Sequence, residues 1–115
     1  MFIATSAVIG AMTAAVSPAL AGTSAYVTGG LLGGGLEKCL TNAKKAATKA
    51  GFTETQEVLM DDDKKAGDFH ADQKDSTLHM TARCDPPRGI WSIAVSGVDN
   101  EQTYKGFNEV LKAFD

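Results

Sequence analysis

The first 36 residues of the chain contain no aspartate, glutamate, lysine, arginine or histidine, and the first charged residue is Glu37. All 11 lysines and arginines and all 14 acidic residues therefore follow this segment. An average soluble domain carries charge throughout, because about a quarter of its residues are charged. Because it lacks charge, the N-terminal segment does not have the composition of a soluble domain. We therefore expect one domain, over residues 36–115.

Residues 2–16 are apolar and mostly small, and Pro18 follows them. Residues 19–21, with the sequence Ala-Leu-Ala, form the small-x-small pattern that signal peptidases cleave. A signal peptide over residues 1–21 is therefore predicted, and the mature chain would be exported to a periplasm or secreted. The basic start that is typical of signal peptides is lacking, since no lysine or arginine precedes the apolar run.

A retained membrane anchor is the alternative interpretation of the same run. Its length nearly matches the hydrocarbon core of a bilayer, which is about 30 Å thick. The run is rich in alanine, serine and threonine rather than leucine, however, and it ends in a cleavage pattern. These features favour the signal peptide, and no stable membrane insertion of the mature chain is expected.

Glycine is concentrated in residues 22–35, which end in the succession Gly33, Gly34 and Gly35. This composition predicts a flexible linker between the signal peptide and the domain. The glycines lack the G-x-G-x-x-G spacing of dinucleotide-binding loops and the Lys-Ser/Thr ending of a phosphate-binding loop. We therefore assign no cofactor-binding residues to this segment.

Two segments have the three- and four-residue apolar spacing of amphipathic helices. The first spans residues 36–50. It is followed by Gly51, which suits the positive φ of a helix C-terminus, and by Phe52, which can fold back on the last turn. The second begins after Asp99, an expected N-cap, with Gln102 three residues later as in a capping box. A helix is thus predicted at each end of the domain.

Four strands are predicted between these helices, at residues 53–60, 67–73, 76–84 and 91–97. Apolar and polar residues alternate best in the last three of them, so one face of each is expected to be buried. The short connections predict antiparallel neighbours. The expected fold class is α+β with two layers, in which a four-stranded antiparallel meander sheet carries both helices on one face in the order α-β-β-β-β-α.

The chain has two cysteines, Cys39 and Cys84. Cys39 lies on the apolar side of the first helix, and Cys84 has the same parity along its strand as Leu78 and Met80. Both sulfurs are therefore expected in the layer between helix and sheet. In an oxidising compartment two cysteines so placed pair, and we predict a Cys39–Cys84 disulfide.

Both histidines of the chain lie in one predicted hairpin. A two-residue turn at residues 74–75 would place His70 directly opposite His79, on the sheet face that the helices leave uncovered. Asp68 and Asp72 share that face on the same strand as His70. Two imidazoles with adjacent carboxylates form a ligand set for Zn²⁺ or Cu²⁺. The alternative is a solvated polar surface that binds no metal or other cofactor.

The sequence contains no complete catalytic set. Ser96 lacks the first glycine of a G-x-S-x-G nucleophile elbow, and the carboxylates of residues 61–63 lack the spacing of a calcium loop. A cysteine nucleophile is not expected, because Cys84 faces inward while His79 faces outward on the same strand. We therefore predict no catalytic residues.

These observations predict an exported, non-catalytic module that binds a protein, a peptide or a small ligand through the uncovered sheet face. The alternative function is a metal-binding protein, or a metal-dependent enzyme, that uses the pair His70 and His79. The net charge of −3 and the pI near 5.3 argue against a nucleic-acid partner. Binding a phosphate backbone requires a basic surface.

Overall fold

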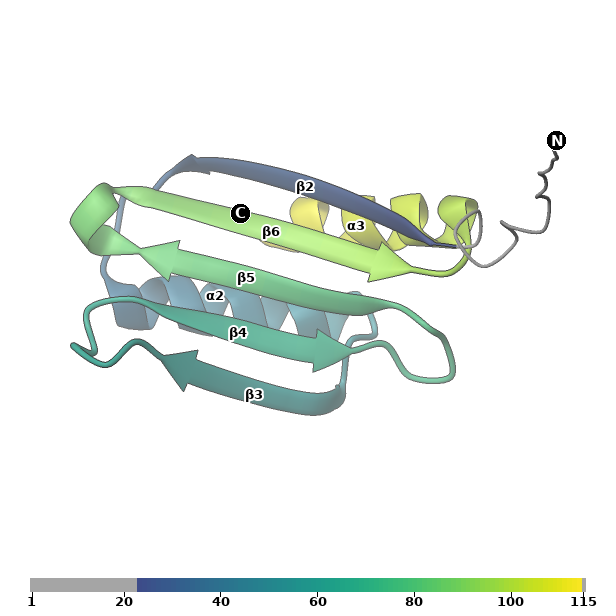
Figure 1. Ribbon diagram of the computed structural model, residues 1–115, viewed down its shortest axis with the longest axis horizontal. Helices are drawn as coiled ribbons and strands as arrows, with labels where there is room; N and C mark the ends of the chain where they lie inside the picture. Colours follow the sequence, from purple (N-terminus) through teal and green to yellow (C-terminus); the bar gives the residue numbers. More distant parts are fainter. Residues whose placement is uncertain (1–22, 115) are drawn as a thin grey trace, which may run out of the picture.

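The computed structural model describes residues 23–114 (Figure 1). Along the chain the elements are β2 (Ser24–Leu31), α2 (Leu36–Lys49), β3 (Glu54–Met60), β4 (Gly67–Asp72), β5 (His79–Asp85), the 3-10 helix η1 (Pro86–Arg88), β6 (Ile90–Gly97) and α3 (Asn100–Phe114). The strands form one sheet, and both α-helices lie on the same face of it, behind the sheet in Figure 1. The fold therefore has two layers, and no described element covers the other sheet face.

The sheet has the strand order β2-β6-β5-β4-β3, and all neighbouring strands are antiparallel. The strands from β3 to β6 follow one another as a meander, so the predicted α+β class, the antiparallel meander and the two helices are confirmed. The predicted number of four strands is wrong, because β2 adds a fifth strand at the edge next to β6. β2 pairs with β6 from Ser24 opposite Gly97 to Leu31 opposite Ile90.

The prediction of a flexible linker over residues 22–35 is therefore wrong for β2. The reason is the packing of Trp91 on the neighbouring strand. A Cβ atom on Gly30 would lie 2.9 Å from the indole ring of Trp91, and one on Gly29 would lie 2.7 Å from the Trp91 carbonyl oxygen. Glycine at these two positions thus lets β2 approach β6 closely. The predicted signal peptide, residues 1–21, lies outside the described residues.

The C-terminus of α2 and the N-terminus of α3 are formed by the residues that the sequence indicated. α2 ends in a Schellman motif, in which the Phe52 N–H donates to the Ala47 carbonyl oxygen over 2.8 Å and Gly51 has a φ of +87°. Asp99 caps α3, because its carboxylate accepts a 2.8 Å hydrogen bond from the Gln102 N–H. No helix in the described part of the chain is long and apolar enough to cross a membrane.

The core lies between the helices and one face of the sheet. α2 contributes small side chains to it, and Ala43, Ala46 and Ala47 are fully buried. Small side chains on the helix allow a close approach to the sheet, where larger side chains fill the remaining volume. The large side chains that are buried in this layer include Phe52, Phe69, Met80, Ile93, Val95 and Val110.

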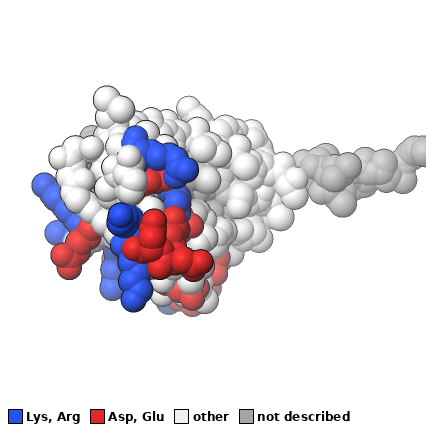
Figure 2. Space-filling model, turned by 60° about the vertical axis from the view of Figure 1, so that its left-hand side comes forward, with Lys and Arg blue, Asp and Glu red and all other residues white. Residues whose placement is uncertain are grey.

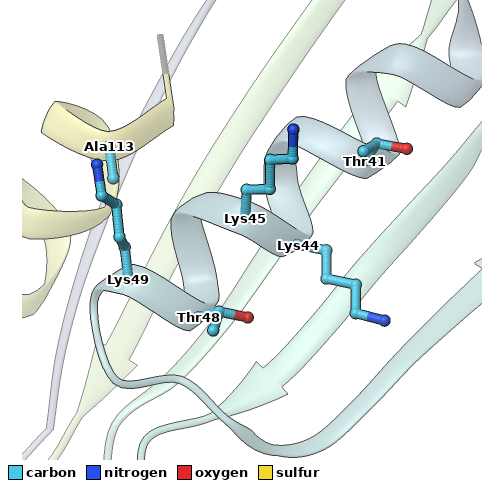
Figure 3. Close-up of a pocket in the computed structure, with 6 residues that line it drawn as sticks. All are labelled: Thr41, Lys44, Lys45, Thr48, Lys49 and Ala113. Carbon is cyan, nitrogen blue, oxygen red and sulfur yellow. The ribbon is translucent and has the colours of Figure 1, made fainter.

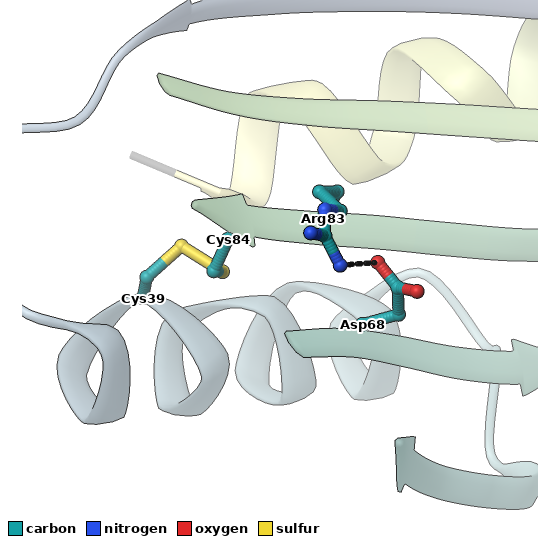
Figure 4. Close-up of a disulfide and its surroundings, with 4 residues drawn as sticks. All are labelled: Cys39, Asp68, Arg83 and Cys84. Atoms are coloured by element: carbon teal, nitrogen blue, oxygen red, sulfur yellow. Dashed lines mark hydrogen bonds and ion pairs between the residues drawn. A yellow bond between two sulfur atoms is a disulfide. The ribbon is translucent and has the colours of Figure 1, made fainter. Parts of the chain in front are cut away.

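The predicted disulfide between Cys39 and Cys84 is confirmed (Figure 4). It joins the first turn of α2 to the end of β5, with 6.0 Å between the two Cα atoms and a sequence separation of 45. Both cysteines are buried. Arg83, the neighbour of Cys84, points to the other side of the sheet and contacts Asp68 of β4 (Figure 4). Alternation along β5 therefore separates a covalent link on the helical side from a polar surface on the other.

Candidate functional site

The hairpin of β4 and β5 contains both histidines, but its register differs from the predicted one. His70 is opposite Thr81, and His79 is opposite Asp72. The predicted pairing of His70 with His79 is therefore wrong by two residues. A shift of two residues keeps every side chain on its side of the sheet. Both histidines consequently still lie on the face opposite the helices, which we call the uncovered face.

The register is set by a turn that is longer than predicted. Residues 74–77 form a loop that is closed by a 2.9 Å hydrogen bond from the Gln73 N–H to the Leu78 carbonyl oxygen. Asp75 has a positive φ of 58°, and the Ser76 hydroxyl accepts a 3.1 Å bond from the Leu78 N–H. Aspartate tolerates left-handed backbone, and a serine hydroxyl stabilises turns. These contacts replace the two-residue turn that was expected.

The histidine rings form a polar cluster on the uncovered face. They stack diagonally across the hairpin, with ring centroids 5.6 Å apart and 28° between the ring planes. Nδ1 of His79 lies 2.7 Å from a carboxylate oxygen of Asp72, and Nδ1 of His70 lies 3.0 Å from the Thr81 hydroxyl. The hydroxyl of Thr55 also donates to Asp72. This bond, together with the bond to His79, lowers the pKa of the Asp72 carboxyl.

The four residues suggested as metal ligands fall into two separate clusters. Asp68 accepts a 3.4 Å hydrogen bond from Arg83, whereas Asp72 belongs to the histidine cluster. Among residues 23–114, no group of three or more His, Cys, Asp or Glu side chains is placed to hold a metal ion. Binding of Zn²⁺ or Cu²⁺ at this hairpin therefore stays a prediction from the sequence.

A second cluster, which was not predicted from the sequence, surrounds Arg83 on β5. The guanidinium donates to both carboxylate oxygens of Asp61, each over 2.8 Å, and it also contacts Asp68. It lies 3.5 Å from Asp85, which is only 3% exposed and accepts a 2.9 Å bond from Arg88. Figure 2 shows acidic and basic side chains side by side at this end of the molecule. We call these five residues the ion network.

The ion network favours the ionised form of two of its carboxylates, Asp61 and Asp85. The hydrogen bond from Arg83 lowers the pKa of the Asp61 carboxyl, and the hydrogen bond from Arg88 lowers the pKa of the Asp85 carboxyl. The contact with Asp61 in turn raises the pKa of Arg83. Charge-assisted bonds of this kind are short and directional. They fix the position of the turn between β3 and β4 relative to β5.

Acid is expected to destabilise the fold as these carboxylates become protonated. A carboxyl with a lowered pKa binds fewer protons in the folded protein than in the unfolded chain, so it stabilises the fold above its ordinary pKa of 3.8. This stabilisation is lost as the pH falls through the lowered pKa of the folded protein. Urea midpoints should therefore change little above about pH 5 and decrease steadily between about pH 4 and pH 2.

Asp85→Asn tests this origin of the acid sensitivity, because Asp85 is the most buried carboxylate of the ion network. The decrease of the urea midpoint in acid should be smaller in this variant than in the unchanged protein. Asp62→Asn, which alters an exposed carboxylate in the turn between β3 and β4, is the matched control and should keep the full decrease. An undiminished decrease in Asp85→Asn would contradict the assignment.

The part of the uncovered face that β2 and β6 form carries no charged side chain, and we call it the neutral half. Three large apolar side chains are exposed in it: Leu31 by 87%, Val27 by 68% and Ile90 by 41%. Leu31 is the cross-strand partner of Ile90, and Val27 is the partner of Ala94. The full set that alternation places there is Ala25, Val27, Gly29, Leu31, Ile90, Ser92, Ala94 and Ser96.

An open cavity of about 580 Å³ lies on the helical side of the molecule, over α2 (Figure 3). Lys44 and Lys45 extend from neighbouring positions of the helix in different directions (Figure 3). Their charges therefore do not converge on one point, as the ligands of a bound anion would. We interpret these lysines as a solvated helix face. The residues around the cavity are Thr41, Lys44, Lys45, Thr48, Lys49 and Ala113.

The fold and the site together define a small α+β protein with one disulfide and an antiparallel sheet, one face of which is left uncovered by the helices of residues 23–114. The uncovered face combines a histidine cluster, an ion network and an apolar neutral half. Comparison with known proteins gives no relative, since no family model, no curated protein and no solved structure matches the chain. Function must therefore be inferred from the chemistry of this face.

Proposed function

We propose that the protein is an exported, non-catalytic module that binds another protein through the uncovered face of its sheet. The observation that supports this proposal is the exposure of Leu31, Val27 and Ile90 together in the neutral half. Covering apolar side chains that are in contact with water lowers the free energy, so a partner that covers all three residues of this face would be stabilised there. An exposed apolar patch with a polar rim is typical of a protein interaction site.

The shape of the face favours a protein partner over a small molecule. Sites for small molecules are concave and enclose most of the ligand. The neutral half is instead made of short side chains on two paired strands, with Gly29, Ala94 and Ser92 between the larger residues. A surface of this kind offers little enclosure, but it can contact a second flat surface over a large area.

The charged hairpin next to the neutral half supports specificity. Asp72 and His79 are bonded to each other in the histidine cluster, and Arg83 is bonded to Asp61 in the ion network. Because these groups already have partners within the chain, they add little to the affinity for another protein, but they are held in fixed positions. Fixed charges at the rim of an interface select partners with a complementary charge pattern and speed their association.

Export is supported by the disulfide between Cys39 and Cys84. Disulfides of this kind form and persist in oxidising compartments, outside the cytosol. A binding module in such a compartment is exposed to changing conditions, and a covalent link between α2 and β5 keeps its sheet in one shape. The proposed location is a periplasm or the extracellular medium.

Site-specific photo-crosslinking tests the binding face. A photoreactive amino acid is placed at Ala94, in the middle of the uncovered face, and, as the matched control, at Thr41 on the outer side of α2. Irradiation of the cells that produce the protein should give an adduct of one defined mass from position 94 and not from position 41. Equal adducts from both positions, or none from position 94, would contradict binding through this face.

A further inference from the structure

The two edges of the sheet are built differently. At the β3 edge the register with β4 shifts between Glu54 and Glu57, and Thr55 between them has a positive φ of 49°. An irregular register and charged side chains are the features by which proteins prevent their edge strands from pairing with other chains. The β3 edge is therefore protected.

The β2 edge has neither of these protections. All eight residues from Ser24 to Leu31 pair with β6 in one continuous register, and none of them is charged or is proline. None of the strands that the structure describes pairs with the outer side of β2. One row of backbone N–H and C=O groups is thus directed outward along a regular strand, which is the template for adding another strand.

The geometry points to a second copy of this chain as the occupant of the β2 edge. We infer that β2 of one copy pairs with β2 of the other in antiparallel fashion, so that the two sheets become one. The strand is free of charge, so two identical strands meet without repulsion. Antiparallel pairing around a two-fold axis also satisfies the backbone groups of both strands equally.

The side chains of β2 fit this symmetry in one register. In a two-fold pair, partners lie on the same face of the sheet, so residues of equal parity face one another. With the axis at Thr28, Val27 of one copy faces Gly29 of the other. Tyr26 then faces Gly30, and Leu31 faces Ala25. Each large side chain is opposite glycine or alanine, and the two edges can approach without collision.

Packing within one chain explains the glycines of β2 but not the lack of charge. Gly29 and Gly30 are needed for the close approach to Trp91. Val27 and Leu31, in contrast, point away from the helices and are largely exposed, so a lysine or glutamate would fit equally well in a monomer. Pairing of two β2 strands accounts for apolar residues at these positions. It would also join the neutral halves of two copies into one surface.

The mass of the purified protein in solution tests the inference, and this measurement needs no other partner. Light scattering after size-exclusion chromatography should give twice the chain mass for the unchanged protein. Val27→Lys places a charge in the middle of the edge, and its mass should fall by half while its circular dichroism stays unchanged. Val58→Lys, at a position of 46% exposure on β3, is the matched control and should keep the double mass.

A cross-link tests the register independently of these substitutions. Residues directly opposite in an antiparallel pair have Cα atoms about 4.5–5.5 Å apart, which a disulfide can span. The double variant Ala25→Cys with Leu31→Cys should therefore form a covalent dimer on oxidation, whereas each single variant should not. A cross-linked dimer supports the inference even if Val27→Lys fails to fold.

Three outcomes would overturn the inference: a single-chain mass of the unchanged protein at all concentrations, loss of the dimer in Val58→Lys but not in Val27→Lys, or pairing of β2 with a strand of another protein instead. The inference does not depend on the proposed function. Dimerisation is measured on the protein alone, whereas binding through the uncovered face is measured at position 94, so either can fail without the other.

Discussion

Replacing Cys39 and Cys84 together by alanine is expected to lower the free energy of unfolding by about 4 kcal/mol. The disulfide closes a loop with a sequence separation of 45, and this loop restricts the unfolded chain far more than the folded one. A domain of this size has a total stability of about 5–15 kcal/mol. Urea unfolding followed by the fluorescence of Trp91, the only tryptophan, measures the loss.

Reduction of the unchanged protein is the matched control for this prediction. It opens the cross-link but leaves both sulfur atoms in the core, so it isolates the effect of the covalent bond from the effect of packing. The reduced protein should lose most of what the double alanine variant loses. If the oxidised and the reduced protein differed by less than about 1 kcal/mol, the contacts of α2 rather than the cross-link would hold the helix on the sheet.

The disulfide and the helix ends can be predicted from the sequence because their causes are local. Apolar spacing places Cys39 on the buried side of α2, and alternation places Cys84 on the buried side of β5. Gly51 ends α2, and Asp99 caps α3, through backbone chemistry that involves only the adjacent turn. In each case a pattern of a few residues contains the physical reason.

β2 and the hairpin register depend on contacts that a local pattern does not contain. The glycines of β2 indicate a linker by composition, and only the indole of Trp91, far along the chain, explains them as residues of a strand. Lys74 and Asp75 carry no strong turn signal. The register of β4 and β5 is instead set by the backbone of Asp75, which is in the left-handed region, and by the hydrogen bond to the Ser76 hydroxyl.

The candidate site is also predictable only in part: the side of the sheet on which its residues lie follows from the sequence, but their contacts do not. His70 and His79 lie on the uncovered face as expected, because parity along a strand survives an error of two residues. The ion network was missed, since the paired contact of Arg83 with Asp61 joins β5 to the turn between β3 and β4, 22 residues earlier in the chain. A sequence shows such charges, but the fold decides which of them meet.

Phe69→Ala is expected to lower the free energy of unfolding by about 3–5 kcal/mol. Phe69 is 1% exposed on the inner side of β4, opposite Ala82 on β5 and Val58 on β3. The helix packed on this strand is α2, whose buried residues are alanines apart from Cys39. Alanine side chains cannot extend into the space that the ring leaves, so the cavity stays open and the full cost is expected. Urea unfolding measures it.

Phe69→Leu is the matched control, since it keeps most of the buried volume and should cost less than about 1.5 kcal/mol. Phe69 and the disulfide both act on the packing of α2 against β4 and β5. Reduction of Phe69→Ala should therefore bring the total loss to about 7–9 kcal/mol, which is comparable with the whole stability of a small domain. The urea midpoint of the reduced variant should be lower than that of either single change. A total loss well below about 7 kcal/mol would show that α2 settles into the cavity, and that its alanine face tolerates more movement than its close packing implies.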